Sequence, residues 1–290
     1  MREAITKLAL RGFFKPFIGP PMGVGFQRRW ANALSVVNPP ARGVDYEWTV
    51  LDGVDCEVIT PRTEVVRTVV YVHGGGYVIG SPATQRAITS HLARAASARV
   101  IVPDYRLAPE HPWPAGLDDA LAVCAATAQR HGSYALAGDS AGGGMALCAA
   151  QRLRDDSGPL PDALVLISPW LDLSNSQPSH AERAERDPML RGAWADENVR
   201  VYVAGQGEPE DARWSPLFGN QRGLPRTLIH VGSEEILHDD AVALDAAMRE
   251  TGVPVTLTVF DGMWHEFHMH ASTLPRAREA VGAIAAFLAD

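Results

Sequence analysis

Short apolar segments alternate with longer helix-like segments along most of this chain, and this alternation constrains the fold more than any other feature. The segment Arg67–His73 (RTVVYVH) is typical: it is rich in β-branched residues, too short for a helix and followed directly by glycines. Strands that are apolar on both sides belong to parallel sheets covered by helices on both faces. The predicted strands are 44–51, 56–60, 67–73, 99–103, 134–137, 163–168, 227–231 and 255–260.

The first two of these strands alternate apolar and polar residues, as half-buried antiparallel strands do. Helix-like segments separate or follow the others, at 83–96, 117–130, 142–155, 239–250 and 276–288. The order of the elements therefore predicts an α/β fold, with a mostly parallel eight-stranded sheet and helices on both faces.

Residues 173–223 break this rhythm, with several prolines, many charges and one helix-like segment at 188–204. An insertion of this kind over the carboxyl edge of the sheet would form a helical cap, and open α/β sheets bind their ligands at that edge. We expect an N-terminal cap segment, residues 1–43, and an α/β domain, residues 44–290, which carries the cap insertion.

The first twenty residues have the pattern of an amphipathic helix. Lys7, Arg11 and Lys15 recur every four residues, and the opposite face carries the apolar residues Ile5, Leu8, Ala9 and Phe13. We expect this helix to pack on the domain with its apolar face over the mouth of a site. Attachment to a membrane surface is the alternative.

The charge balance and the cysteine count exclude several classes of protein. With 26 basic and 34 acidic residues, the net charge is −8, which disfavours a nucleic-acid partner. No apolar run reaches the ~20 residues that cross a bilayer, so no membrane insertion is expected. Three scattered cysteines, without a C-x-x-C pair, favour neither a disulfide framework nor a zinc site. The charges that interrupt the N-terminal apolar residues argue against a signal peptide, so we expect a cytoplasmic protein.

The pentapeptide Gly138-Asp139-Ser140-Ala141-Gly142 is a G-x-S-x-G pattern directly between a predicted strand and a predicted helix. A sharp strand-to-helix turn needs glycines at its outer positions because both sides of the serine are crowded. Such a turn would hold the Ser140 hydroxyl at the edge of the sheet as a nucleophile. A glycine-rich turn that only packs a helix on a sheet is the alternative.

The tetrapeptide His73-Gly74-Gly75-Gly76 also follows a predicted strand. Three glycines leave backbone N–H groups free to converge on a developing negative charge. The alternative takes Gly74, Gly76 and Gly80 as a dinucleotide-binding turn. It is disfavoured because this strand is the third in the chain, and no acidic residue ends a strand about 20 residues later.

A serine nucleophile needs a base, and the base needs an acid that orients it. His265 lies in a loop after the last predicted strand, and His268 and His270 are its rivals. The loop after strand 227–231 offers the candidate acids Glu234, Glu235, Asp239 and Asp240. The first two are favoured because they lie nearest the end of the strand, and the order serine, acid, histidine is that of α/β-hydrolases. A zinc site is disfavoured, since the run H-E-F-H is one residue shorter than H-E-x-x-H.

Five motifs, YVHGGGYVIG, DYRLAPEHPWPA, GDSAGG, SPWLDLS and MWHEFH, resemble those of the hormone-sensitive-lipase family, the bacterial family IV carboxylesterases. The resemblance extends from about residue 66 to the C-terminus and implies an α/β-hydrolase fold. The acid loop of that family usually reads D-P-L-x-D, which places Glu235 at the catalytic acid with Ser140 and His265. The resemblance further implies oxyanion donors at the N–H groups of Gly74, Gly75 and Ala141.

The same resemblance implies that the N-terminal residues form part of the cap, and it suggests a homodimer through strand 255–260. In the motif DYRLAPEHPWPA, we expect Arg106 and Glu110 to brace the loops around the site and to take no part in the chemistry.

These observations predict a serine carboxylesterase that hydrolyses short-chain esters of small molecules through an acyl-enzyme, without a metal or organic cofactor. Trp170, Trp194 and Trp214 are candidates to line the substrate pocket, although each of them could equally belong to the core. The alternatives on the same scaffold are an amidase or arylacetamide-type deacetylase, and a non-catalytic receptor. The plant gibberellin receptors are receptors of this kind and lack the catalytic histidine.

Overall fold

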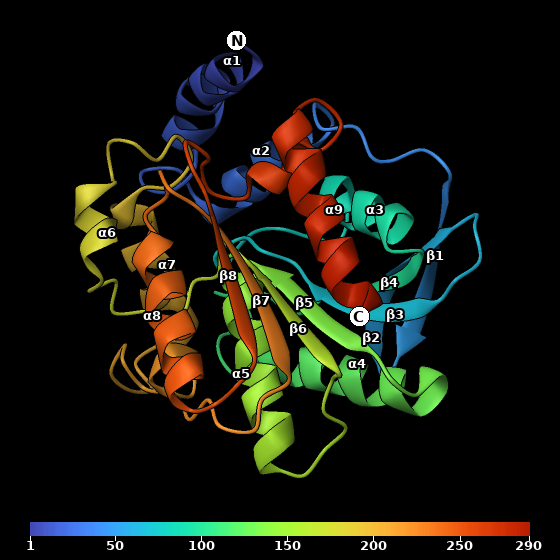
Figure 1. Ribbon diagram of the computed structural model, residues 1–290. Helices are drawn as coiled ribbons and strands as arrows, with labels where there is room; N and C mark the ends of the chain where they lie inside the picture. The colour runs from blue at the N-terminus through green and yellow to red at the C-terminus, as the bar shows by residue number, and fades with distance from the viewer.

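A single eight-stranded sheet forms the centre of the computed structural model, which describes residues 1–290 (Figure 1). Its strand order is β1-β2-β4-β3-β5-β6-β7-β8. Strand β2 is antiparallel to both of its neighbours, and the remaining pairs are parallel. The strands are β1 Val44–Leu51, β2 Val54–Pro61, β3 Arg67–Val72, β4 Ala98–Pro103, β5 Ala135–Asp139, β6 Ala163–Ile167, β7 Arg226–Gly232 and β8 Val255–Phe260. All eight predicted strands are thus present, with ends shifted by no more than two residues.

Helices cover both faces of the sheet, because successive residues of its central strands point to opposite sides and both sides are apolar. In β3, Val69 and Tyr71 belong to the core under α3 (Arg86–Ala95) and α9 (Pro275–Ala289). Val70 and Val72 belong to the larger core on the other face. The helices on that second face are α4 Ala115–His131, α5 Ala141–Asp155 and α8 His238–Glu250.

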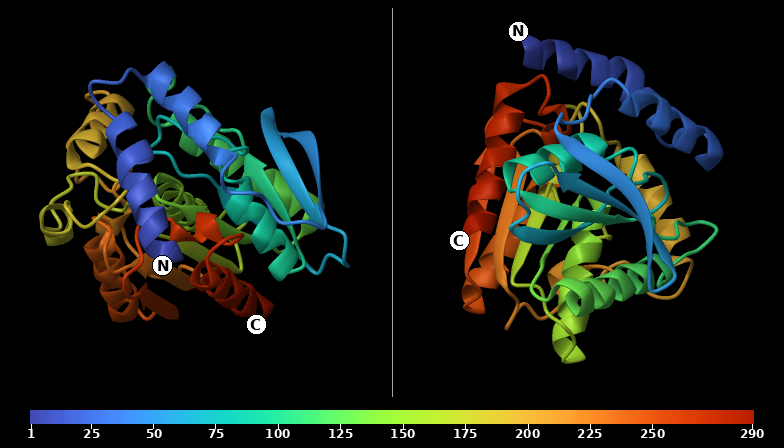
Figure 2. Two further views of the ribbon diagram at one scale, coloured as in Figure 1. Left: turned by 90° about the horizontal axis from the view of Figure 1, so that it is seen from above. Right: turned by 90° about the vertical axis from the view of Figure 1, so that its right-hand side faces the viewer.

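Four further helices form a cap over the carboxyl ends of the parallel strands (Figures 1 and 2). They are α1 Arg2–Ala9, α2 Val24–Ser35, α6 Pro178–Glu182 and α7 Gly192–Val203. A π-helical turn and a short 3-10 helix continue α1 to residue 17. The sequence did not predict α2, in which only one side chain, that of Gln27, is buried. None of the helices combines the length and the apolar character needed to span a membrane.

The N-terminal helical segment, residues 2–17, contacts the body of the protein through its charged face. The Lys7 ammonium lies 2.5 Å from a carboxylate oxygen of Glu234, and Lys15 donates to the carbonyl oxygens of Ala184 and Asp187 at 2.8 and 2.6 Å. Between them, Arg11 donates to two carbonyl oxygens of the same loop at 3.0 and 3.2 Å. The apolar side chains of this segment stay largely exposed. Ile5, Ala9 and Phe13 line the cavity described below, and Leu8 does not.

Candidate active site

The turn that carries Ser140 joins the end of β5 to the start of α5. Ser140 has φ +53° and ψ −124°, a strained conformation for a residue other than glycine. Glycine is required on both sides of it. A Cβ atom on Gly138 would lie 2.3 Å from the Gly142 carbonyl oxygen, and one on Gly142 would lie 2.2 Å from the Val72 carbonyl oxygen. The sequence prediction of a crowded strand-to-helix turn agrees with this geometry.

Ser140, His265 and Glu235 form a continuous hydrogen-bonded chain. The Ser140 Oγ lies 3.0 Å from His265 Nε2, and His265 Nδ1 lies 2.8 Å from Glu235 Oε2. The three side chains come from three loops, after β5, after β8 and after β7, and all three residues are at least 96 % buried. A hydroxyl, an imidazole and a carboxylate in this arrangement can generate a serine nucleophile.

Glu235 is held in place by two further donors. Its Oε1 accepts a hydrogen bond from the Gly232 N–H at 2.5 Å and another from the Ser168 hydroxyl at 2.8 Å. Ser168 follows β6, and sequence reasoning missed it, although it is the first residue of the SPWLDLS motif. Glu234, the rival acid, instead pairs with Lys7 of α1.

The surroundings of His265 favour its protonated form. Burial lowers the pKa of its imidazolium, but the hydrogen bond and the negative charge of Glu235 act in the opposite direction, and Asp187 and Asp139 add to them. The net result is a pKa above the ordinary value of 6.5. A base with a raised pKa accepts the serine proton more readily, provided that the pH keeps it neutral beforehand.

The glycine loop after β3 corrects one sequence-based assignment. The Gly74 N–H donates to Asp139 Oδ1 at 3.1 Å, so it is not free to bind an oxyanion. The N–H groups of Gly75 and Gly76 donate to no protein acceptor, and both residues have positive φ, +124° and +61°. The N–H of Ala141 is the first of α5 and has no acceptor within the helix. The free donors are therefore those of Gly75, Gly76 and Ala141.

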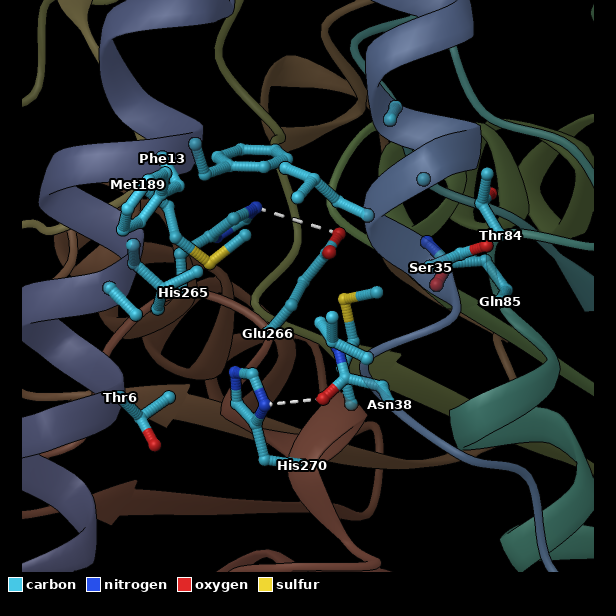
Figure 3. A pocket seen from close by; sticks show the side chains of 18 of the residues that line it. Thr6, Phe13, Ser35, Asn38, Thr84, Gln85, Met189, His265, Glu266 and His270 are labelled. Carbon is cyan, nitrogen blue, oxygen red and sulfur yellow. Dashed lines mark hydrogen bonds and ion pairs between the residues drawn. The ribbon is translucent and has the colours of Figure 1, made fainter.

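An apolar cavity of about 770 Å³ opens beside Ser140 and His265 (Figure 3). The cap supplies Ile5, Phe13, Met189, Leu190 and Trp194 to its lining. A volume of this size is ordinary for a small-molecule site.

Of the three tryptophans predicted for the pocket, only Trp194 lines it. Trp170 is turned away, because its indole N–H donates to the side-chain oxygen of Asn175 at 3.0 Å and it packs near Tyr77. Trp214 packs edge-on against Trp113. Both belong to the larger hydrophobic core.

The rival candidates have other partners. His268 Nε2 lies 3.2 Å from His230 Nδ1, and His270 Nδ1 lies 2.7 Å from Asn38 Oδ1. Asp239 and Asp240 accept hydrogen bonds from backbone N–H groups of the cap insertion and of the loop after β6. Nowhere in the chain do three or more His, Cys, Asp or Glu side chains gather so that they could hold a metal ion.

The two residues expected to brace the loops do form ion pairs. Arg106 pairs with Asp119 at 2.7 Å and donates to the Ala115 carbonyl oxygen, and Glu110 pairs with Arg28 of α2 at 2.7 Å. Neither residue lines the cavity beside Ser140.

A mostly parallel sheet with a serine on a strand-to-helix turn, a histidine after the last strand and an acid between them defines the α/β-hydrolase class. A family model described as "alpha/beta hydrolase fold" matches residues 69–269. The chain therefore belongs to the α/β-hydrolase family, in its hormone-sensitive-lipase branch, as the motifs predicted.

Relatives and solved structures agree with this assignment. An acetyl-hydrolase from Streptomyces hygroscopicus is 43 % identical over 80 % of this chain and 78 % of its own length. An esterase from Acinetobacter venetianus is 34 % identical over 82 % of this chain and 79 % of its own. The crystal structure of an esterase from the bacterial hormone-sensitive lipase family superimposes with a TM-score of 0.93 at 34 % identity, covering 99 % of this chain and 97 % of the other.

The positions of the two glutamates generate a first prediction. Replacing Glu235 with Gln removes the charge that stabilises the imidazolium, and we expect kcat to fall by about 10⁴-fold, as it does when a triad acid is neutralised. Glu234→Gln breaks only a partly exposed ion pair with Lys7, worth about 0.2–1 kcal/mol, and should leave kcat nearly unchanged. Steady-state kinetics of both variants on one ester shows which of the two glutamates is the acid that orients His265. A crippled Glu234→Gln beside an active Glu235→Gln would contradict the placement of the acid.

The position of α1 generates a second prediction. Deleting residues 1–17 removes one wall of the cavity but no residue of the central core, since no residue from 2 to 17 is buried. We expect kcat/KM to fall by a larger factor than the folded population of the truncated chain. Steady-state kinetics measures the first quantity, and thermal unfolding measures the second. Full activity on butyrate esters in the truncated chain would show that α1 is no functional part of the cap.

Proposed function

We propose that this protein hydrolyses short-chain carboxylic esters through an acyl-enzyme formed on Ser140. The observation that carries the proposal is the hydrogen-bonded chain from Glu235 through His265 to Ser140, which ends at an apolar cavity beside three free backbone N–H groups. The reaction class, hydrolysis of carboxylic esters, is that of the relatives named esterases, and the prediction of a carboxylesterase is confirmed at this level.

In the first half of the reaction, the Ser140 Oγ attacks the ester carbonyl carbon while its proton passes to His265 Nε2. The carboxylate of Glu235 keeps Nδ1 protonated and stabilises the imidazolium that forms. The oxyanion of the tetrahedral intermediate lies against the N–H groups of Gly75, Gly76 and Ala141, each worth about 3 kcal/mol in comparable sites. His265 then returns its proton to the oxygen of the leaving alcohol, and the acyl group stays on Ser140.

In the second half, a water molecule takes the place of the alcohol. His265 Nε2 removes one of its protons, the water oxygen attacks the acyl carbonyl carbon, and the same N–H groups bind the second oxyanion. Collapse of this intermediate returns the proton to Ser140 Oγ and releases the carboxylic acid.

The short acyl chain is part of the proposal. It is supported by the relative named acetyl-hydrolase and by the bulky Met189, Leu190 and Trp194 that the cap places over the cavity. A short acyl group fills only part of a 770 Å³ cavity and leaves the remainder for the alcohol. The division into an N-terminal cap segment, residues 1–43, and a hydrolase domain, residues 44–290, also belongs to this proposal, as does a cytoplasmic location.

A homodimer through β8 is a further part of the proposal. It is supported by the position of this strand at the edge of the sheet, where it pairs only with β7. Its outer side presents Val259, which is 42 % exposed, to solvent.

Changing the proposed nucleophile tests the reaction directly. Ser140→Ala removes the only group that forms the acyl-enzyme, so we expect no measurable hydrolysis of p-nitrophenyl esters of any chain length. The wild type should prefer acetate and butyrate to longer chains, and matched anilides should react far more slowly. A serine-directed organophosphate should add once per chain, and labelling at any other serine would refute the assignment.

The raised pKa of His265 predicts the pH dependence. Because the base must be neutral to accept the serine proton, kcat/KM should fall as the pH drops through the His265 pKa, with a midpoint above 6.5. Without the charge of Glu235, the pKa should move downward, since burial then dominates. The pH profile on p-nitrophenyl acetate checks the wild type, and an imidazole NMR titration checks Glu235→Gln. An unchanged pKa in that variant would contradict the role given to Glu235.

A further inference from the structure

Glu266, the residue after His265, is the only acidic residue that lines the cavity. It has φ +51°, a left-handed conformation that few residues other than glycine adopt, and its backbone N–H donates to the Ser168 hydroxyl at 3.2 Å. This conformation turns the side chain into the cavity, where its Oε1 lies 3.6 Å from His265 Nε2 (Figure 3). The mechanism above does not use this buried carboxyl.

The Glu266 carboxyl lies against a second one, that of Asp139. Oxygens of both converge on Gly74, where a Cβ atom would come within 2.3 Å of Asp139 Oδ2 and 2.6 Å of Glu266 Oε1. The two carboxyls are not equivalent. Asp139 accepts hydrogen bonds from the Gly74 N–H at 3.1 Å and from the Gln85 amide at 2.8 Å, so it is the better stabilised anion.

Glu266 is therefore the member of the pair that keeps a proton. Burial raises its pKa well above the ordinary value, and the negative charge of Asp139 raises it further. A neutral carboxyl suits this position. An ionised one would form an ion pair with Nε2–H of the imidazolium and compete with the leaving group for that proton.

We propose that Glu266 is a catalytic residue of the second half-reaction, in which its Oε1 accepts a hydrogen bond from the water molecule that attacks the acyl-enzyme. The inference rests on the proposed acyl-enzyme mechanism. Any oxygen from which His265 Nε2 removes a proton must lie within hydrogen-bond distance of Nε2. Because Glu266 Oε1 is only 3.6 Å from the same nitrogen, one water molecule can contact both atoms.

The two protons of the water then have separate destinations. One passes to His265 Nε2 as the water oxygen bonds to the acyl carbon, and the other stays on that oxygen and becomes the hydroxyl proton of the carboxylic acid. The retained proton grows more acidic as the bond forms, so an acceptor facing it stabilises the transition state. Glu266 itself neither gains nor loses a proton.

An alcohol that attacks the acyl-enzyme has only the proton that His265 removes. Its carbon takes the place of the second proton, against which the Glu266 oxygen offers no hydrogen bond. Glu266 thus assists water selectively, and it favours hydrolysis over transfer of the acyl group to an alcohol.

Partitioning of the acyl-enzyme tests this role. The wild type, Glu266→Gln and Glu266→Met are given p-nitrophenyl butyrate at a fixed concentration of methanol, and butyrate and methyl butyrate are quantified. Gln is the isostere of a neutral Glu: it keeps an oxygen acceptor and can donate an N–H to Asp139. Met has nearly the same length and no comparable acceptor. We expect Gln to stay near the wild-type ratio and Met to raise the ratio of methyl butyrate to butyrate by about tenfold, the value of one hydrogen bond.

The product ratio does not depend on how much of a variant folds, so a merely structural role cannot produce the expected result. If Glu266→Met loses hydrolysis and methanolysis equally, or if Glu266→Gln changes the ratio as much as Met does, the inference is overturned. If the wild type releases no p-nitrophenol from p-nitrophenyl butyrate, the proposed ester hydrolysis fails instead, and this outcome is distinguishable from either of the others.

Discussion

The backbone crowding around the first turn of α5 is the constraint on which the rest of the site depends. Gly142, Gly143 and Gly144 place three successive positions of that turn against two other segments: the end of β3, and the loop after β6 at Pro169 and the Trp170 carbonyl oxygen. Glycine in a helix is unfavourable by about 1 kcal/mol relative to alanine, so such a run is retained only where close approach requires it. The approach fixes Ser140 relative to the glycine loop after β3 and to Ser168, the donor that holds Glu235.

The fold and the catalytic candidates could be predicted from the sequence, whereas the residues that line the pocket could not. Strands reveal themselves through local composition, and the residues at their carboxyl ends must meet at one edge of the sheet, so Ser140, Glu235 and His265 follow from topology and motif. The direction of the Trp170 side chain depends on a contact with a residue distant in the sequence. Its backbone packs on Gly144, and this contact directs its indole ring to Asn175. Which N–H group of the glycine loop is free depends likewise on Asp139, 65 residues away from Gly74. No local pattern contains that information.

The cap and the acid loop are built as one unit around Asp187, a fully buried carboxyl of the cap insertion. Its Oδ1 accepts the N–H groups of Met189 and Leu190, which line the cavity, at 2.8 and 3.0 Å. Its Oδ2 accepts the N–H of Ile236, the residue after the proposed catalytic acid, at 3.1 Å. The backbone oxygen of Asp187 in turn accepts from Lys15 at the end of the N-terminal segment. A shift of the cap therefore moves the cavity wall and the acid loop together, which links substrate enclosure to the position of Glu235.

Two carboxyls flank the single imidazole, and their partners decide what each can do. Glu235 receives only donors, from Gly232, Ser168 and His265, so its charged form is satisfied at every contact. Glu266 faces an apolar cavity on one side and another carboxyl on the other, so its charged form is opposed at nearly every contact. The environment thus assigns an ionised acid to the Nδ1 side of His265, where positive charge must be stabilised, and a neutral one to the Nε2 side, where protons must pass freely. If both carboxyls were ionised, the imidazolium would be stabilised too strongly to give its proton to the leaving group. If both carboxyls were neutral, the imidazolium would not form readily. The chemistry of the site depends on this asymmetry, which is set by backbone donors that follow the strand ends.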